Sequence, residues 1–153
     1  MCNNWPEIPI SVGGATGGLI GNTVMICEGD KCYSLTSEKA TLATHMSFSR
    51  AGAASIVIND TTLWVTGGNY NFGLLASTEY VTMTKTMPGP DLPMGLDGHA
   101  MVVINSTCSM VIGGHLSGEG ANYCQLFGFN IKNSEYYIIL YCIYSFYEII
   151  LVG

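Results

Sequence analysis

One sixteen-residue segment occurs twice in the chain. Residues 53–68, AASIVINDTTLWVTGG, align without a gap to residues 99–114, HAMVVINSTCSMVIGG, with eight identical positions. Roughly one identity would be expected by chance from average residue usage. Repetition with a period of roughly 20–50 residues is typical of solenoids and propellers, so this repeat constrains the fold more than any other feature.

A weaker third copy, GGLIGNTVMICEG, occupies residues 17–29. The steps from Gly29 to Gly68 and from Gly68 to Gly114 are 39 and 46 residues. Each copy is followed by a polar stretch rich in Gly, Asn and Ser and then by a short run with an aromatic residue. Another extended piece leads into the next copy, so each unit is expected to hold four extended segments.

The segments have the composition of β-strands. They are four to eight residues long, rich in Val, Ile, Thr and aromatic residues, and separated by Asn-Asp, Asn-Ser and Gly-Gly. No part of the repeated region is predicted to be helical. Five glycines are expected to be structural, at positions where a Cβ would clash or where the backbone needs a positive φ: Gly29, Gly67, Gly68, Gly113 and Gly114.

The unit resembles the kelch repeat. The features that carry the resemblance are two apolar strands ending in Gly-Gly, a unit near 40–50 residues, and a downstream tyrosine, Tyr33 or Tyr80. The resemblance implies an all-β fold, a partial β-propeller of about three four-stranded blades. The kelch-repeat segment covers residues 1–135, with units at about 6–49, 50–96 and 97–135.

Kelch rings close with about six or seven blades, which is more than three. The chain is therefore expected to be a fragment, a truncated product or part of a larger assembly. Its open blade edges could self-associate.

Kelch propellers bind other proteins through the loops of one face. The resemblance therefore implies a non-catalytic protein-protein interaction module with an unknown protein partner. The candidate contact residues, chosen by loop position, are Arg50, Tyr70, Asn71, Phe72, Asp97, His99 and His115. The alternative is a fragment of a secreted or membrane-tethered enzyme similar to galactose oxidase, with an active site outside this chain.

Charge and motifs narrow the function classes. The net charge is −6 with five Lys and Arg, so the chain has no basic stripe for nucleic acid. No Ser-His-Asp arrangement or carboxylate pair is recognisable, and GGATGG at 13–18 lacks the Lys-Ser/Thr of a phosphate-binding loop. No enzyme activity, cofactor or metal is expected.

Two of the six cysteines, Cys27 and Cys32, flank the four residues EGDK. On the blade interpretation they end the second strand and begin the third, opposite each other at roughly 4.5–5.5 Å between Cα atoms, which a disulfide can span. Two alternatives stay open. The cysteines could be buried free thiols, or half of a zinc site that lacks a second ligand pair at a usual spacing.

The sequence contains two N-glycosylation sequons, at Asn59 and Asn105, in equivalent turns between the first and second strands. Asn, Asp and Ser are also the residues that tight turns favour, and this is the preferred explanation. The sequons still give a slight lean toward the secretory pathway. The N-terminal residues show no signal-peptide pattern.

The last residues, 136–153, are set apart as an apolar C-terminal tail of unclear role. The run approaches the length of a membrane span, and residues 137–152 are the candidate anchor. Glu148 within it and its abundance of Ile and Tyr favour strands instead. A membrane association is therefore not the preferred interpretation.

Overall fold

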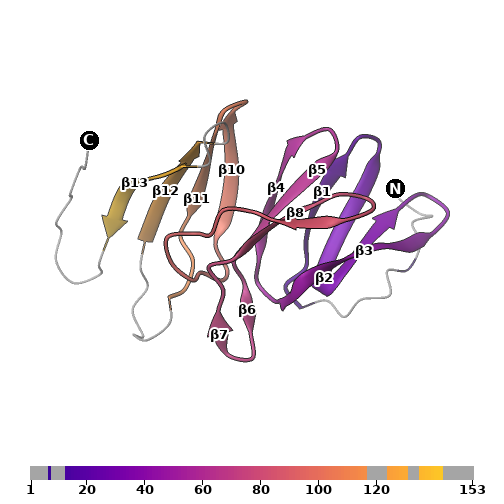
Figure 1. Cartoon of the computed structure of the whole chain (residues 1–153), viewed down its shortest axis with the longest axis horizontal. Coiled ribbons are helices and arrows are strands. Elements are labelled where there is room, and N and C mark those ends of the chain that lie inside the picture. The colour runs from indigo at the N-terminus through magenta and orange to yellow at the C-terminus, as the bar shows by residue number, and fades with distance from the viewer. Residues whose placement is uncertain (1–6, 8–12, 117–123, 131–134, 143–153) are drawn as a thin grey trace.

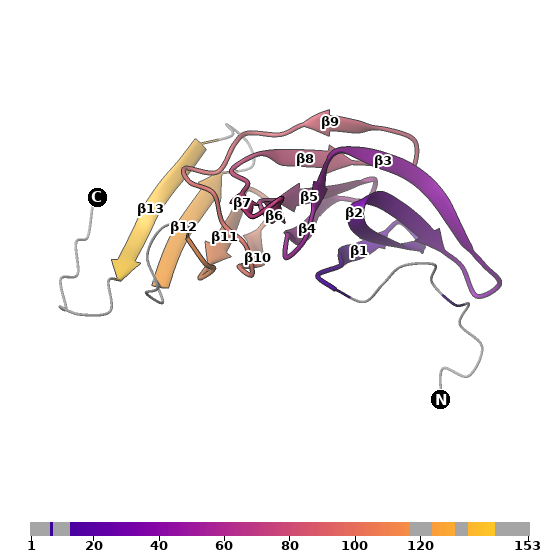
Figure 2. The ribbon, with the colours of Figure 1, turned by 90° about the horizontal axis from the view of Figure 1, so that it is seen from below.

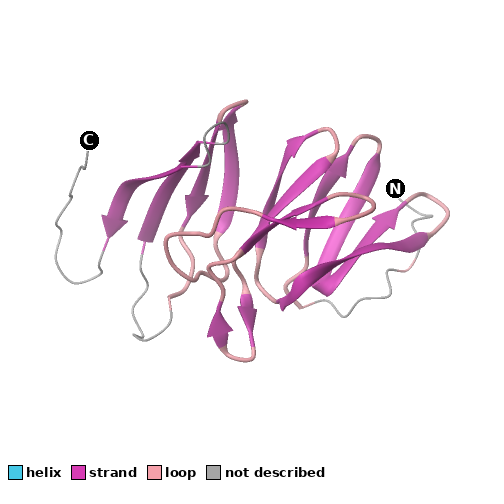
Figure 3. Cartoon of the chain, viewed as in Figure 1, coloured by secondary structure: helices cyan, strands magenta, loops and turns pink. Residues whose placement is uncertain are grey.

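A computed structural model describes residue 7 and residues 13–116, 124–130 and 135–142. These residues form strands and loops and include no helix, as Figure 3 shows. The strands make three antiparallel sheets and one short hairpin. The predicted all-β fold is therefore confirmed.

The first sheet has the order β1 (Thr16–Ile20), β2 (Thr23–Leu35) and β3 (Ala40–Arg50). The second contains β4 (Ala54–Asn59), β5 (Thr62–Thr66), β8 (Thr78–Val81) and β9 (Thr86–Pro88). The hairpin consists of β6 (Asn69–Tyr70) and β7 (Gly73–Leu74). The third sheet contains β10 (Ala100–Asn105), β11 (Cys108–Ile112), β12 (Cys124–Asn130) and β13 (Glu135–Cys142).

The three sheets stand side by side in chain order and form an arch (Figures 1 and 2). The first strands of the sheets, β1, β4 and β10, lie on its concave side, whereas β3 and β9 lie on the convex side (Figure 2). Within the described ranges none of the sheets closes on itself. The arrangement is an open series in which each sheet packs face to face on the next.

Two sheets differ from the expected division of the sequence. The first has three strands rather than four, because Thr23–Leu35 is one strand that pairs with β1 and then with β3. In the third sheet β13 pairs with β12, from Asn130 opposite Glu135 to Cys124 opposite Cys142. Residues 136–142, set apart as the start of a tail, are thus in the fourth strand, and residues 143–153 lie outside the described residues.

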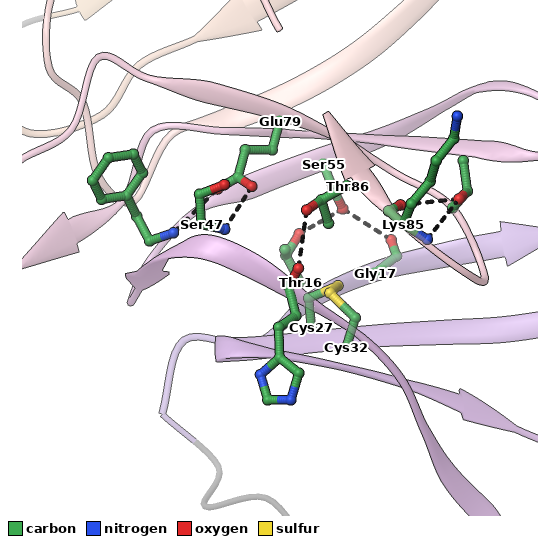
Figure 4. The surroundings of a disulfide bond; sticks show 12 residues. Thr16, Gly17, Cys27, Cys32, Ser47, Ser55, Glu79, Lys85 and Thr86 are labelled. Carbon is green, nitrogen blue, oxygen red and sulfur yellow. Dashed lines mark hydrogen bonds between the residues drawn. A yellow bond between two sulfur atoms is a disulfide. The ribbon is translucent and has the colours of Figure 1, made fainter. Parts of the chain in front are cut away.

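The first and second sheets are joined by an apolar cluster. Its buried members alternate along their strands toward the facing sheet: Ile20, Met25, Cys27, Cys32, Met46, Leu63, Val65 and Val81. Oγ1 of Thr16 and Oγ of Ser55 share a hydrogen bond of 2.6 Å across the joint, beside the disulfide in Figure 4. Burial of this apolar surface supplies the main stabilisation of the joint.

The second and third sheets are joined by two apolar clusters, one around Trp64 and Phe129 and the other around Leu92, Leu96 and Val111. The rings of Trp64 and Phe129 lie 4.2 Å apart between centroids, and Ile56 and Met101 pack beside them. Nε1 of the buried Trp64 donates to Oγ1 of Thr78 at 2.9 Å. The indole is therefore buried without losing its hydrogen bond.

All five glycines expected to be structural have positive φ. Gly67 and Gly113 occupy equivalent places in the repeat, with φ of 58° and 68°, and each begins the turn out of the sheet. A Cβ on Gly67 would overlap the Leu96 carbonyl oxygen. At this position glycine is required by both conformation and space.

Candidate partner-binding face

The hairpin β6–β7 projects from one side of the arch, near its middle and below the second sheet in Figure 1. Its turn residues, Asn71 and Phe72, have φ of 50° and 66° although neither is glycine. The Phe72 side chain is fully exposed, and that of Tyr70 is about half exposed. A strained turn that holds aromatic rings in solvent is typical of a contact site rather than of a scaffold.

An open groove of about 560 Å³ lies beside this hairpin. Its lining comes from three places: the bend of β2 at residues 28–31 (the Gly29 bend), the end of β3 with the connection to β4, and the β6–β7 hairpin. The lining residues are Gly13, Glu28, Gly29, Asp30, Lys31, Tyr33, Ser49, Arg50, Ala51, Asn69, Tyr70 and Asn71. The groove thus combines acidic, basic, amide and phenol groups. Such a lining suits a polar or peptide-like ligand better than an apolar one.

Asp97 and His115 continue the face toward the third sheet. Nδ2 of Asn69 donates to Oδ2 of Asp97 at 2.8 Å, and Nδ1 of His115 lies 3.8 Å from Oδ1 of the same carboxylate. The backbones of Asp97 and His115 also form an isolated bridge, as those of Ala51 and Asn69 do one unit earlier. The loops of the second and third sheets are therefore joined on the side of the molecule from which the hairpin projects.

Arg50, expected from its loop position to contact a partner, is instead buried between the first and second sheets. Its guanidinium is buried and donates to the carbonyl oxygens of Gly67 and Ser77 at 2.8 and 2.7 Å, and to Oε1 of Glu79 at 2.9 Å. Glu79 in turn accepts from the backbone N–H of Ser47 at 2.8 Å (Figure 4). Arg50 ties the first sheet to the second and offers a partner almost no surface.

His99 is buried as well. Its Nε2 and Oγ1 of Thr66 share a hydrogen bond of 2.8 Å, whereas its Nδ1 finds no partner among the residues that the structure describes. Burial lowers the pKa of the imidazole to about 4, against a smaller opposing effect of Asp97. At neutral pH His99 is thus an uncharged core residue between the second and third sheets.

A disulfide joins Cys27 and Cys32, with 4.0 Å between their Cα atoms, as Figure 4 shows. Five residues of straight strand would span roughly 16 Å, so the chain must bend back within EGDK. The sequence prediction of a disulfide is confirmed, but both cysteines belong to β2 rather than to two strands. The bridge fixes the bend that forms one wall of the groove.

Asp30 in the same bend receives a hydrogen bond of 3.0 Å from Nδ1 of His45. This bond is the main reason that the pKa of the Asp30 carboxyl is lowered. Both side chains are about half exposed, so water screens the pair.

The two sequons adopt one conformation. Oδ1 of Asn59 accepts from the N–H and hydroxyl of Thr61, and Oδ1 of Asn105 accepts from the same groups of Thr107, all at 2.8–2.9 Å. These are Asx turns, which close the tight hairpins β4–β5 and β10–β11. The side-chain oxygens therefore have a structural use, and both asparagines remain exposed.

The described ranges hold neither a metal cluster nor a membrane-spanning helix. No three His, Cys, Asp or Glu side chains within them lie close enough together to hold a metal ion. Nor do those ranges contain a helix long and apolar enough to cross a membrane.

The candidates from sequence are thus divided. Tyr70, Asn71 and Phe72 lie on the hairpin, and Asp97 and His115 lie beside it, whereas Arg50 and His99 are buried. Sequence reasoning missed Asn69 and the groove residues of the Gly29 bend. The repeat alignment could have identified Asn69, because Asn69 follows the glycine pair Gly67-Gly68 as His115 follows Gly113-Gly114.

Comparison with known proteins finds a solved structure with a similar fold but no matching protein family. No protein-family model and no curated protein matches the sequence. Among solved structures, the structure of YjhT is similar, with a TM-score of 0.71 and 20% identity, over 86% of this chain and 51% of that chain. The chain therefore shares the fold of about half of YjhT.

Proposed function

We propose that the chain is an arc of a kelch-type β-propeller that binds another protein through the face built around the β6–β7 hairpin. The exposure of Phe72 on a turn with two left-handed non-glycine residues carries this proposal. A two-residue hairpin turn of this type normally has glycine at its second position, where phenylalanine costs of order 1–3 kcal/mol. Aromatic anchors are enriched where interfaces gain most binding energy.

Three further observations support a protein ligand. The groove beside the hairpin is open and polar, as the rim of a protein interface is. Its walls come from the first and second sheets and are fixed by the disulfide and by Arg50. The aromatic tip can therefore enter a pocket of the partner while the rigid groove receives a segment of its chain.

The Cys27–Cys32 disulfide supports a secreted or extracellular location for this function. Stable disulfides persist in oxidising compartments and are rare in the cytosol. Asn59 and Asn105 remain exposed candidates for glycan attachment there.

Site-specific photo-crosslinking tests the proposal. A benzophenone amino acid at position 72 should yield a discrete crosslinked protein from extracellular extracts. The matched control carries the same group at Thr84, an exposed residue between β8 and β9. Tyr70→Ser in the position-72 protein should weaken the crosslink at least tenfold.

The result that would overturn the proposal is a crosslinked product that forms equally from both positions, or from neither. Equal capture would show adhesion without a preferred face. Retention of the crosslink in the Tyr70→Ser protein would show that Tyr70 does not contribute to the contact.

A further inference from the structure

On β10 and β11 of the third sheet, the side chains that point away from the second sheet are apolar and exposed to water. Val102 and Ile104 of β10 are 44% and 53% exposed, and Met110 of β11 is partly exposed. Their neighbours Met101 and Val111 point the other way and pack toward the second sheet. Exposed aliphatic residues in a row along one strand are unusual on a sheet face that water alone covers.

The internal repeat shows what covers such a face. Forty-six residues earlier, the counterparts of Val102, Ile104 and Met110 are Ile56, Ile58 and Trp64. In the second sheet these residues are packed beneath the next sheet, with Trp64 against Phe129. The third sheet therefore presents the chemistry that receives a following sheet.

The first sheet presents the complementary face. Gly18 pairs with Met25 as Ile56 pairs with Trp64, which aligns the two sheets strand by strand. In this alignment three residues of the first sheet correspond in order to Val57, Leu63 and Val65, which the second sheet packs on the first. The three residues are Leu19, Val24 and Ile26.

These three are not covered as their counterparts are. Leu19 is 58% exposed and the other two are partly exposed, whereas Leu63 and Val65 are fully buried. The first sheet thus offers the surface that lies on a preceding sheet. One molecule carries both halves of a sheet-to-sheet joint, at opposite ends of the arch (Figure 2).

We infer that a second copy of this chain covers both faces. The third sheet of each copy packs on the first sheet of its partner, and a two-fold axis repeats the same contact twice. The contact continues the packing already seen between sheets within the chain. Two arcs of three sheets make six, within the roughly four to eight of closed sheet rings.

Two observations favour a second copy over a different protein. The third sheet of one copy can cover the first sheet of the other, and the reverse, so a ring of two copies leaves neither apolar face in water. In addition, the chain matches about half of the YjhT chain, 51%, so two copies approach one such fold in extent. Two-fold dimers are also the commonest closed oligomers.

Light scattering during size exclusion tests the inference. The wild-type chain should have about twice its monomer mass of 16.4 kDa. Ile104→Glu and Leu19→Lys should each have the monomer mass, because each places a charge in both copies of the contact. The control Phe72→Ser removes an exposed aromatic residue far from these faces and should remain a dimer.

Mixing the two charged variants gives the sharpest outcome. In the mixed dimer one contact pairs the introduced carboxylate at position 104 with the introduced ammonium at position 19, and the other contact is native. The mixture should therefore recover the dimer mass. The replaced side chains are exposed in the single chain, so circular dichroism should be unchanged; if Ile104→Glu is misfolded, Val102→Ser takes its place.

Each contrary result overturns the inference. A wild-type monomer would show that another occupant, such as further sheets of a longer polypeptide, covers the faces. A dimer that survives Leu19→Lys would mean contact between two third sheets, and species above the dimer would mean an open head-to-tail series. Loss of the hairpin crosslink leaves these masses unchanged, so the two proposals fail separately.

Discussion

At the scale of single residues, two buried polar groups decide how the sheets are joined. Arg50 and Glu79 form an ion pair with 0% and 3% side-chain exposure, and the arginine also satisfies two backbone carbonyls. His99 is buried uncharged beside Thr66. Because a buried polar group is costly when its partner is lost, removing one member of either set should destabilise the joint that it spans.

Arg50→Met should destabilise the fold by about 3–5 kcal/mol, because Glu79 would be left in the interior without its ion-pair partner. Urea unfolding followed by tryptophan fluorescence measures the change. The control Asp30→Asn removes the half-exposed pair with His45 and should cost less than about 1 kcal/mol. Equal losses in the two variants would contradict the buried role of Arg50.

His99 should make stability depend on pH. Its pKa is about 4 when folded and near 6.5 when unfolded, so the unfolded chain binds an extra proton between these values. The free energy of unfolding should therefore fall as the pH drops from about 6.5 to 4. The loss due to this group is about 3 kcal/mol and is complete below pH 4.

Urea titrations of the wild type and His99→Gln across this range isolate the contribution, since carboxylates titrate in both proteins. The variant should lose less stability than the wild type between pH 6.5 and 4, by about the 3 kcal/mol assigned to His99. Parallel curves for the two proteins would show that His99 is not held uncharged in the folded state.

At the scale of elements, the turn after each glycine pair is the most constrained connection. Gly67 and Gly113 have nearly the same φ but different surroundings. At Gly67 an added Cβ meets the Leu96 carbonyl, and at Gly113 it meets nothing within 4 Å among the described residues. Gly67 and Gly113 thus have the same backbone conformation, but only at Gly67 would an added Cβ also meet a neighbouring atom of the described residues.

Gly113→Ala should cost only the conformational strain, about 1–2 kcal/mol. Gly67→Ala should cost at least about 2 kcal/mol more, because the backbone of Leu96 must shift. Differential scanning calorimetry of the two variants provides the comparison. Similar melting temperatures would show that the Leu96 contact relaxes without cost.

The hairpin β6–β7 illustrates what the sequence could not predict at this scale. Its strands have two residues each, too short for an alternating pattern, and its turn residues Asn71 and Phe72 are not the Asn-Gly pair that signals such a turn. By contrast, the hairpins β4–β5 and β10–β11 were predictable. Their alternating apolar residues and Asn-containing turns are local signals.

At the scale of the whole molecule, the repeat was enough to predict an all-β chain built of similar units. It could not predict how the units meet, because Arg50 and Glu79 are 29 residues apart and nothing local couples them. The place of β13 in the third sheet was not predicted either. The third unit was expected to end at residue 135, and the apolar run after it has no counterpart in the earlier units.

The two joints between the sheets differ in chemistry at equivalent positions of the repeat. Arg50 and Leu96 stand at equivalent places in the repeat, one in a polar joint with Glu79 and the other in an apolar cluster with Leu92 and Val111. Exchanging these two side chains would put a leucine against a buried carboxylate and a guanidinium into a hydrocarbon cluster. Equivalent positions of the repeat are thus no longer interchangeable, because each is matched to the chemistry of its own joint.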